Sequence, residues 1–141
     1  MALEKKEFSG DGCRYAVEGP YSHGDVNAAI VRCEGYIDAS TVSAFEDAIE
    51  YAFQQGYHAV LDMAGITFIG SRGCGTLIAQ LSAGKEKGLE LMLIGVQEDV
   101  RETLEVLGLD DVLTYYATID DALQEEDPKK KEITEAVRGA F

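Results

Sequence analysis

The stretch MAGITFIGSRGCGTLIAQL, residues 63–81, joins an apolar run, a cluster of small residues and a helical pattern. Its second half carries apolar side chains at Cys74, Leu77, Ile78 and Leu81. This spacing of three, one and three places them on one face of a helix. The intervening GSRGCG is typical of a turn. We therefore expect a strand that turns over small residues into a helix spanning Cys74–Ala83.

Ser71 lies in this turn, just before the predicted helix. Two interpretations fit the position. The hydroxyl can cap the helix, which is the common role of serine at such a place. It can also stand exposed near unpaired backbone N–H groups and the positive end of the helix dipole, where an added phosphate is well tolerated. Local sequence leaves both a cap and a phosphorylation site open.

The composition is that of an acidic globular domain. The chain has 141 residues, 46% of them hydrophobic, which suits one domain with a substantial core. Its 26 acidic and 12 basic residues give a net charge of -14, which argues against nucleic acid and anionic membrane surfaces as partners. No apolar run has the length of a membrane span, and MALEKKEF lacks signal-peptide features, so we expect a cytoplasmic protein.

The chemistry-bearing residues predict no metal site, no cofactor and no enzyme. The three cysteines form no CxxC motif, and no histidine pair has metal-ligand spacing. GSRGCG fits neither a phosphate-binding loop nor the nucleophile elbow of hydrolases. Ser71, His58 and Asp62 could be drawn as a triad, and Cys74 is a second candidate nucleophile. Neither has a convincing base, so an enzyme is the weakest interpretation.

Apolar strands alternate with helical patterns on both sides of the central stretch. Strands are expected at residues 13–19, 27–38, 58–63, 89–96 and 111–118. In the second of these, Ala29 and Val31 share one face and Ile30 points to the other. Further helices are expected to begin near residues 41, 99 and 119, the second with Val100, Leu104 and Leu107 pointing inward. The segment YSHGD, after Gly19 and Pro20, is expected to be a loop. This order predicts an α/β domain with a mixed sheet.

The clearest boundary in the chain falls at Asp127 and Pro128. We expect a domain at residues 1–126, with its core at about 27–124, followed by a C-terminal tail or short helix at 127–141. The tail has three lysines, which favour a solvated linker. An amphipathic helix that docks on an acidic patch of the same domain is the alternative, with Ile133, Val137 and Phe141 on its apolar face.

The central stretch resembles the signature of the STAS domain, the fold of bacterial anti-sigma-factor antagonists. That signature is an apolar strand with Asp, an aromatic and an aliphatic residue, Asp-Ser-Ser/Thr-Gly-Leu-Gly, and an apolar helix. The matching residues here are Leu61, Asp62, Phe68, Ile69, Ser71, Gly73, Gly75 and Leu77. GYIDAST matches upstream, and the segment from GLELMLIGV to IDDAL resembles the family's last strands and helices. The resemblance implies a mixed sheet with about four to five helices packed mainly on one face.

The resemblance also implies a protein-binding switch. In the family, the serine that aligns with Ser71 is phosphorylated by an anti-sigma factor that is also a serine protein kinase, and a serine phosphatase reverses the step. The unphosphorylated antagonist binds the kinase and frees a sigma factor. The residues that correspond to the partner-binding regions are Asp38, Ser40, Gly70, Ser71, Arg72 and Gly73. We expect Asp38 and the Ser71 turn to share one exposed surface, unless Asp38 only caps the helix after it.

Two residues beside Ser71 depart from the family pattern. Gly70 replaces the acidic residue before the serine, and Arg72 replaces the hydroxyl residue after it. Arg72 could pair with a phosphate. The alternative is therefore a STAS adaptor or regulatory module, which binds a partner or a small anion without being phosphorylated.

Overall fold

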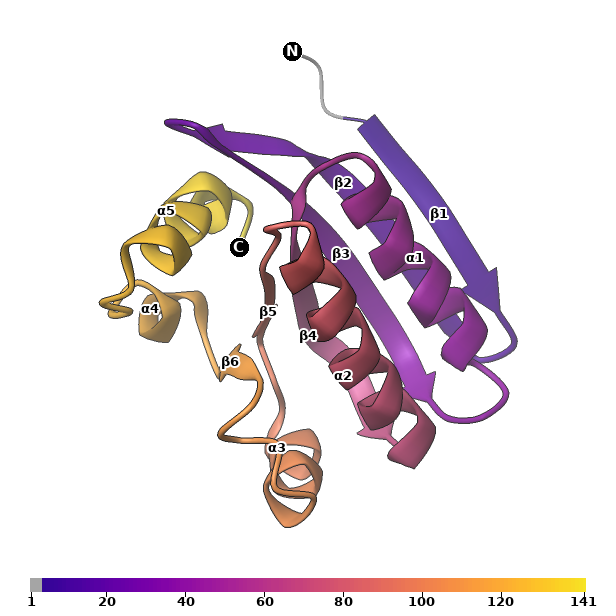
Figure 1. Cartoon of the computed structure of the whole chain (residues 1–141). Coiled ribbons are helices and arrows are strands. Elements are labelled where there is room, and N and C mark those ends of the chain that lie inside the picture. Colours follow the sequence, from indigo (N-terminus) through magenta and orange to yellow (C-terminus); the bar gives the residue numbers. More distant parts are fainter. Residues whose placement is uncertain (1–3) are drawn as a thin grey trace.

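Six strands form one sheet, in the order β1-β2-β3-β4-β5-β6, in a computed structural model that describes residues 4–141 (Figure 1). β1 to β3 pair antiparallel, and β3 to β6 pair parallel. The strands are β1 (Glu4–Gly10), β2 (Cys13–His23), β3 (Val26–Ile37), β4 (His58–Ile69), β5 (Leu91–Ile94) and β6 (Thr114–Tyr116). The predicted α/β fold with a mixed sheet is confirmed.

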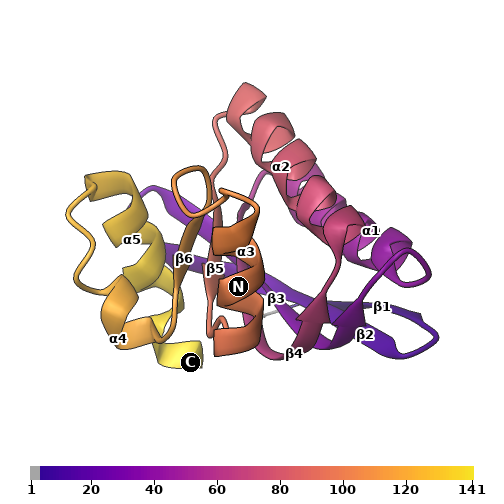
Figure 2. The same ribbon diagram turned by 90° about the horizontal axis from the view of Figure 1, so that it is seen from below.

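The helices divide between the two faces of this sheet. They are α1 (Val42–Gln54), α2 (Ser71–Glu86), α3 (Glu98–Val106), α4 (Ile119–Ala122) and α5 (Pro128–Val137), with a 3-10 turn at Arg138–Ala140. Figure 2 shows α1 and α2, the two longest, side by side over one face. Residues of α3 join the same apolar cluster, whereas α4 and α5 contribute to a cluster on the opposite face.

The larger cluster forms because alternate strand residues point to the α1 and α2 side. In β3, Ala29 and Val31 face this side, as the sequence predicts, while Ile30 faces the other. The predicted inward residues of α2, Leu77 and Leu81, are buried. These side chains pack α2 against the sheet and so fix the position of Ser71.

The smaller cluster corrects the expectation of a solvated tail. Ile133 and Val137 of α5 are buried against Ile30 and other apolar residues of the sheet. Asp127 caps α5, since its carboxylate accepts hydrogen bonds from two backbone N–H groups of the first turn. The first part of β4, from Ala59 to Leu61, and the whole of β5 are apolar on both sides and need cover on both faces, which explains why the tail docks. The division of the chain at residue 127 stays a prediction, and residues 1–3 lie outside the described part.

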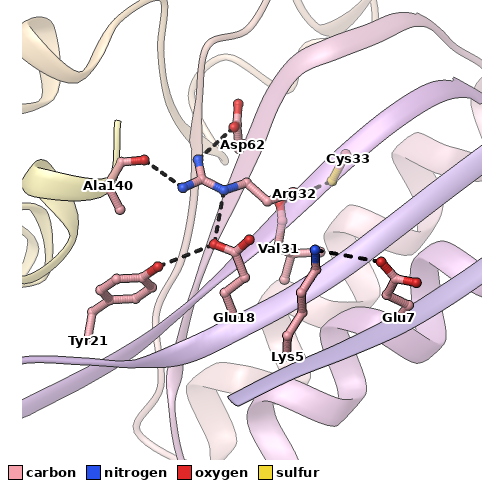
Figure 3. A network of polar contacts seen from close by, with 9 residues as sticks. All are labelled: Lys5, Glu7, Glu18, Tyr21, Val31, Arg32, Cys33, Asp62 and Ala140. Atoms are coloured by element: carbon pink, nitrogen blue, oxygen red, sulfur yellow. Dashed lines mark hydrogen bonds and ion pairs between the residues drawn. The ribbon is translucent and has the colours of Figure 1, made fainter. Parts of the chain in front are cut away.

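A cluster of polar contacts closes the same face of the sheet. Arg32 of β3 pairs with Glu18 at 3.2 Å and with Asp62 at 2.9 Å, and it donates a hydrogen bond to the carbonyl oxygen of Ala140 at 2.5 Å (Figure 3). The ring of Phe141 lies over its guanidinium, 5.1 Å away. Arg32 thus joins three strands to the end of the chain.

Some of the predictions from the sequence are wrong. β2 does not end at Gly19 and Pro20 but continues to His23, because the register shifts between Glu18 and Tyr21 and pairing with β3 then resumes. β4 runs on to Ile69, so the turn expected at GSRGCG reduces to Gly70. Leu107, expected inward, is 48% exposed.

Gly73 explains why α2 begins so early. A Cβ atom at this position would lie 2.6 Å from Ile37 Cγ2 and 2.7 Å from Ile69 Cγ1. Only a residue without a side chain lets the first turn of the helix approach the ends of β3 and β4 so closely. Gly73, one of the small residues that suggest a turn in the sequence, is therefore a packing residue within a helix.

Candidate functional site

The ends of β3 and β4 bring the predicted switch residues to one edge of the sheet. Ile37 and Ile69 are paired, and the backbone N–H of Gly70 donates to the carbonyl oxygen of Ile37 at 2.8 Å. Asp38 follows the first of these strands and Ser71 the second. Both side chains therefore lie at the carboxyl end of the parallel strands, a common position for functional groups in α/β proteins.

Ser71 is the first residue of α2 and is exposed. The N-cap is Gly70, in an extended conformation, so the interpretation of Ser71 as the cap is wrong. The first backbone bond across this end runs from the N–H of Cys74 to the carbonyl oxygen of Gly70, at 3.1 Å. The preceding three N–H groups have no intrahelical partner, and the dipole is positive here. The hydroxyl stands where an added anion is stabilised.

Asp38 shapes the connection from β3 to α1. Its Oδ1 accepts hydrogen bonds from the backbone N–H of Ser40 at 2.8 Å, from Ser40 Oγ at 2.7 Å and from the N–H of Thr41 at 3.2 Å. These donors, the Ser40 hydroxyl first, hold the pKa of Asp38 below its ordinary value. Asp38 is therefore an anion with a structural role at the start of α1. A contact role for it stays a prediction.

The remaining predicted contact residues differ in exposure. Ser40 and Arg72 are exposed, and Gly70 is half-buried. Gly73 is buried and packs α2 on the sheet, and a contact role for it stays a prediction. Arg72 places a cation in the first turn of α2, and this turn has no acidic residue.

The possible catalytic triad of Ser71, His58 and Asp62 is not assembled in the structure. His58 and Ser71 flank opposite ends of β4, and twelve residues of strand span roughly 35 Å or more. His58 Nδ1 accepts the N–H of Glu90 at 2.9 Å, and Asp62 is paired with Arg32. Cys74 is buried, and burial raises the pKa of its thiol. These contacts remove the geometric basis for both nucleophile interpretations.

Within residues 4–141, no three His, Cys, Asp or Glu side chains group so that they could hold a metal ion. None of the helices that the structure describes has both the length and the apolarity to cross a membrane.

A groove beside Ser71 was not anticipated from the sequence. It has a volume of about 500 Å³ and lies between the end of β4 and α3. Phe68, Val106 and Leu107 are exposed in it, and Asp99 and Glu102 also line it. One signal was available: Val106 is an apolar residue that falls outside the inward face of α3.

The fold and the serine at the start of α2 define a known class of domain. The STAS domain family matches residues 21–122, and the chain belongs to this family. The chain is 27% identical over 84 residues to an anti-sigma-B factor antagonist of Staphylococcus epidermidis, covering 59% of this chain and 78% of the relative. It is 26% identical over 80 residues to the anti-sigma-B factor antagonist of Listeria monocytogenes, covering 56% and 70%.

Solved structures agree with this assignment. An anti-sigma factor antagonist from Mycobacterium paratuberculosis is 26% identical and superimposes with a TM-score of 0.61, over 87% of this chain and 92% of that chain. The antagonist SpoIIAA in its unphosphorylated form gives a TM-score of 0.61 over 78% of this chain and 94% of its own. It is 15% identical, so this likeness shows the fold alone.

Proposed function

We propose that the protein is an anti-sigma-factor antagonist that is switched by phosphorylation of Ser71. The observation that carries the proposal is the exposed hydroxyl of Ser71 at the first position of α2, in a chain whose relatives are anti-sigma factor antagonists. A partner serine kinase, itself the anti-sigma factor, transfers the terminal phosphoryl group of ATP to Ser71 Oγ and releases ADP. A serine phosphatase returns the protein to its binding form.

Physical chemistry supports a switch at this position. A phosphate adds about −1.5 to −2 charges at a single point. Within the protein, the free N–H groups at the start of α2 stabilise it. Within an interface, a charge without a partner costs roughly 2–5 kcal/mol. At about 1.4 kcal/mol per factor of ten, that is about thirty-fold or more in affinity.

Arg72 favours a second candidate, an adaptor that binds a partner or a small anion without being phosphorylated. Its guanidinium follows Ser71 directly and is exposed. It can pair with a phosphate on Ser71 and so reduce the effect of the modification, or it can bind an anion in its own right. Gly70 removes the acidic side chain that the family places before the serine.

The experiment compares phosphorylation and binding in matched variants. The kinase partner is first identified from native lysate and purified, and ATP-dependent transfer to the protein is followed by mass spectrometry. Phosphate should appear on Ser71 in the wild type and be absent from Ser71→Ala. Ser82→Ala, which changes an exposed serine farther along α2, should behave as the wild type.

Binding then separates the two candidates. Ser71→Ala should bind the partner and remain locked in the binding form, while the phosphorylated wild type should bind about thirty-fold more weakly. Ser71→Asp should weaken binding less, since a carboxylate has less charge and bulk than a phosphate. Equal affinity of wild type, Ser71→Asp and phosphorylated protein would rule out the switch and leave the adaptor.

A further inference from the structure

The groove between β4 and α3 gathers apolar side chains that the fold leaves open. Phe68 is 53% exposed, Val106 is 86% exposed and Leu107 is 48% exposed. Val112 and Phe141 are the other large apolar side chains with such exposure within residues 4–141, and neither lines this groove. Scattered exposed apolar residues are ordinary, but three around one hollow mark a contact surface.

One wall of the groove is acidic and lacks counter-charges. α3 carries four acidic residues and one arginine. Arg101 is paired with Glu98 and Glu105 on the helix itself. Asp99 and Glu102, the two carboxylates that line the groove, have no salt-bridge partner among the described residues. Both carboxylates can therefore pair with a cation on a bound partner.

The opposite wall has a different character. It is formed by the end of β4, by Gly70 and by Ser71, and none of these lining residues carries a charge. The groove therefore has apolar side chains in its interior, negative charge on the α3 side and the switch hydroxyl on the other. This asymmetry defines the chemistry of what can lie in it.

We infer that this groove receives an apolar side chain from a basic segment of the partner protein, with flanking lysine or arginine residues against Asp99 and Glu102. The inference rests on the proposed function, because it names the part of the kinase that recognises this surface. Apolar anchors in a desolvated pocket carry most of the energy of such interfaces, and flanking charges set orientation and specificity. Since Ser71 lines the same hollow, a phosphoryl group on it lies beside the anchor.

The test uses short random peptides displayed on phage, selected on the unphosphorylated wild type and counter-selected on Val106→Glu. Enriched sequences should share an apolar residue flanked by lysine or arginine. The most enriched peptide is then synthesised and its affinity measured. Val106→Glu should bind it at least about tenfold more weakly, and Glu102→Gln about threefold more weakly.

Matched variants keep the outcome clear. Val112→Glu adds the same charge at an exposed apolar position outside the groove and should bind like the wild type. Leu107→Gln repeats the loss of affinity without adding charge, and circular dichroism verifies that each variant is folded. No enrichment that depends on Val106, or enrichment of acidic sequences, would overturn the inference. Dimerisation of the wild type that Val106→Glu abolishes would assign the groove to a second copy of this chain and also overturn it.

The result is independent of the phosphorylation test. Peptide selection needs neither kinase nor ATP, so its failure leaves phosphorylation of Ser71 to be judged separately. Failure of phosphate transfer, in turn, would remove the switch and leave the measured peptide affinity in place.

Discussion

One face of the sheet is covered by α1, α2 and α3, and the other by α4 and α5, and the two coverings use different contacts. The first is a continuous apolar cluster that includes the helices' buried side chains. The second combines a smaller apolar cluster with the ion pairs of Arg32 and its hydrogen bond to Ala140 (Figure 3). The comparison indicates that the first face determines whether the domain folds, while the second determines whether the tail stays docked.

The largest effect is expected on the first face. Leu77→Ala removes a fully buried side chain of α2 and should lower the free energy of unfolding by about 2–5 kcal/mol. Leu107→Ala, the same change at a position that is 48% exposed, should cost about 0.5 kcal/mol or less. Denaturant melts measure both. A cost below about 0.5 kcal/mol for Leu77→Ala would contradict its placement in the core.

A smaller and more local effect is expected on the second face. Arg32→Ala leaves Glu18 and Asp62 without their cation and Ala140 without its donor. Because these side chains are partly exposed, the cost should be about 1–3 kcal/mol. Hydrogen exchange should show α5 losing protection before α2 does.

A control lies within the tail itself. Arg138→Ala removes an exposed pair with Glu135 and should change stability by about 0.5 kcal/mol or less. If Arg32→Ala loosened α2 and α5 equally, the two faces would form one cooperative unit and the comparison would fail.

The third prediction concerns pH and the second face. Burial, with a contribution from the charge of Lys129 on α5, lowers the pKa of His58 below its ordinary value. The folded protein therefore favours neutral His58. The contribution of this residue to the free energy of unfolding is complete above about pH 6.5 and is lost as the pH falls through the lower pKa of the folded state. His58→Gln should flatten the dependence of unfolding free energy on pH in that window. His23→Gln, at the exposed histidine, serves as the control, and identical slopes for His58→Gln and wild type would contradict the prediction.

The smallest effect on stability is expected from Asp38→Asn, at the edge of the sheet between the two faces. The amide oxygen keeps an acceptor for the N–H groups of Ser40 and Thr41, so the melting temperature should stay close to that of the wild type. The negative charge at this edge of the sheet is lost, and affinity for the partner should fall. Unchanged affinity together with unchanged stability would leave Asp38 with its turn role alone.

Much of the fold could be predicted because hydrophobic periodicity is a local property. Alternation in β3 separated Ala29 and Val31 from Ile30, and helical spacing identified Leu77 and Leu81 as core residues. The start of α2 could not be predicted in this way. Glycine is needed at position 73 because the first turn of α2 lies close to Ile37, and this contact joins segments that are distant in sequence.

The docking of the tail and the groove at the site could not be predicted from local sequence patterns either. The lysines of α5 suggested solvent, and only the open apolar face of the sheet explains the burial of Ile133 and Val137. The resemblance predicted one shared surface for Asp38 and Ser71, and the paired ends of β3 and β4 bring the two residues to one edge of the sheet. Their contact with a partner stays a prediction. The groove escaped prediction because its two walls come from β4 and α3, whose separation no local pattern encodes.

The contact between Arg32 and Ala140 also has a consequence for the order of events in the cell. The two residues are 108 positions apart in the chain. At a synthesis rate of about 5–20 residues per second, roughly 5–20 s pass between the making of Arg32 and that of its last partner. The α5 side of the sheet therefore stays uncovered during translation after its strands have been made. In that interval a nascent chain exposes Ile30 and its neighbours to any chaperone near the ribosome.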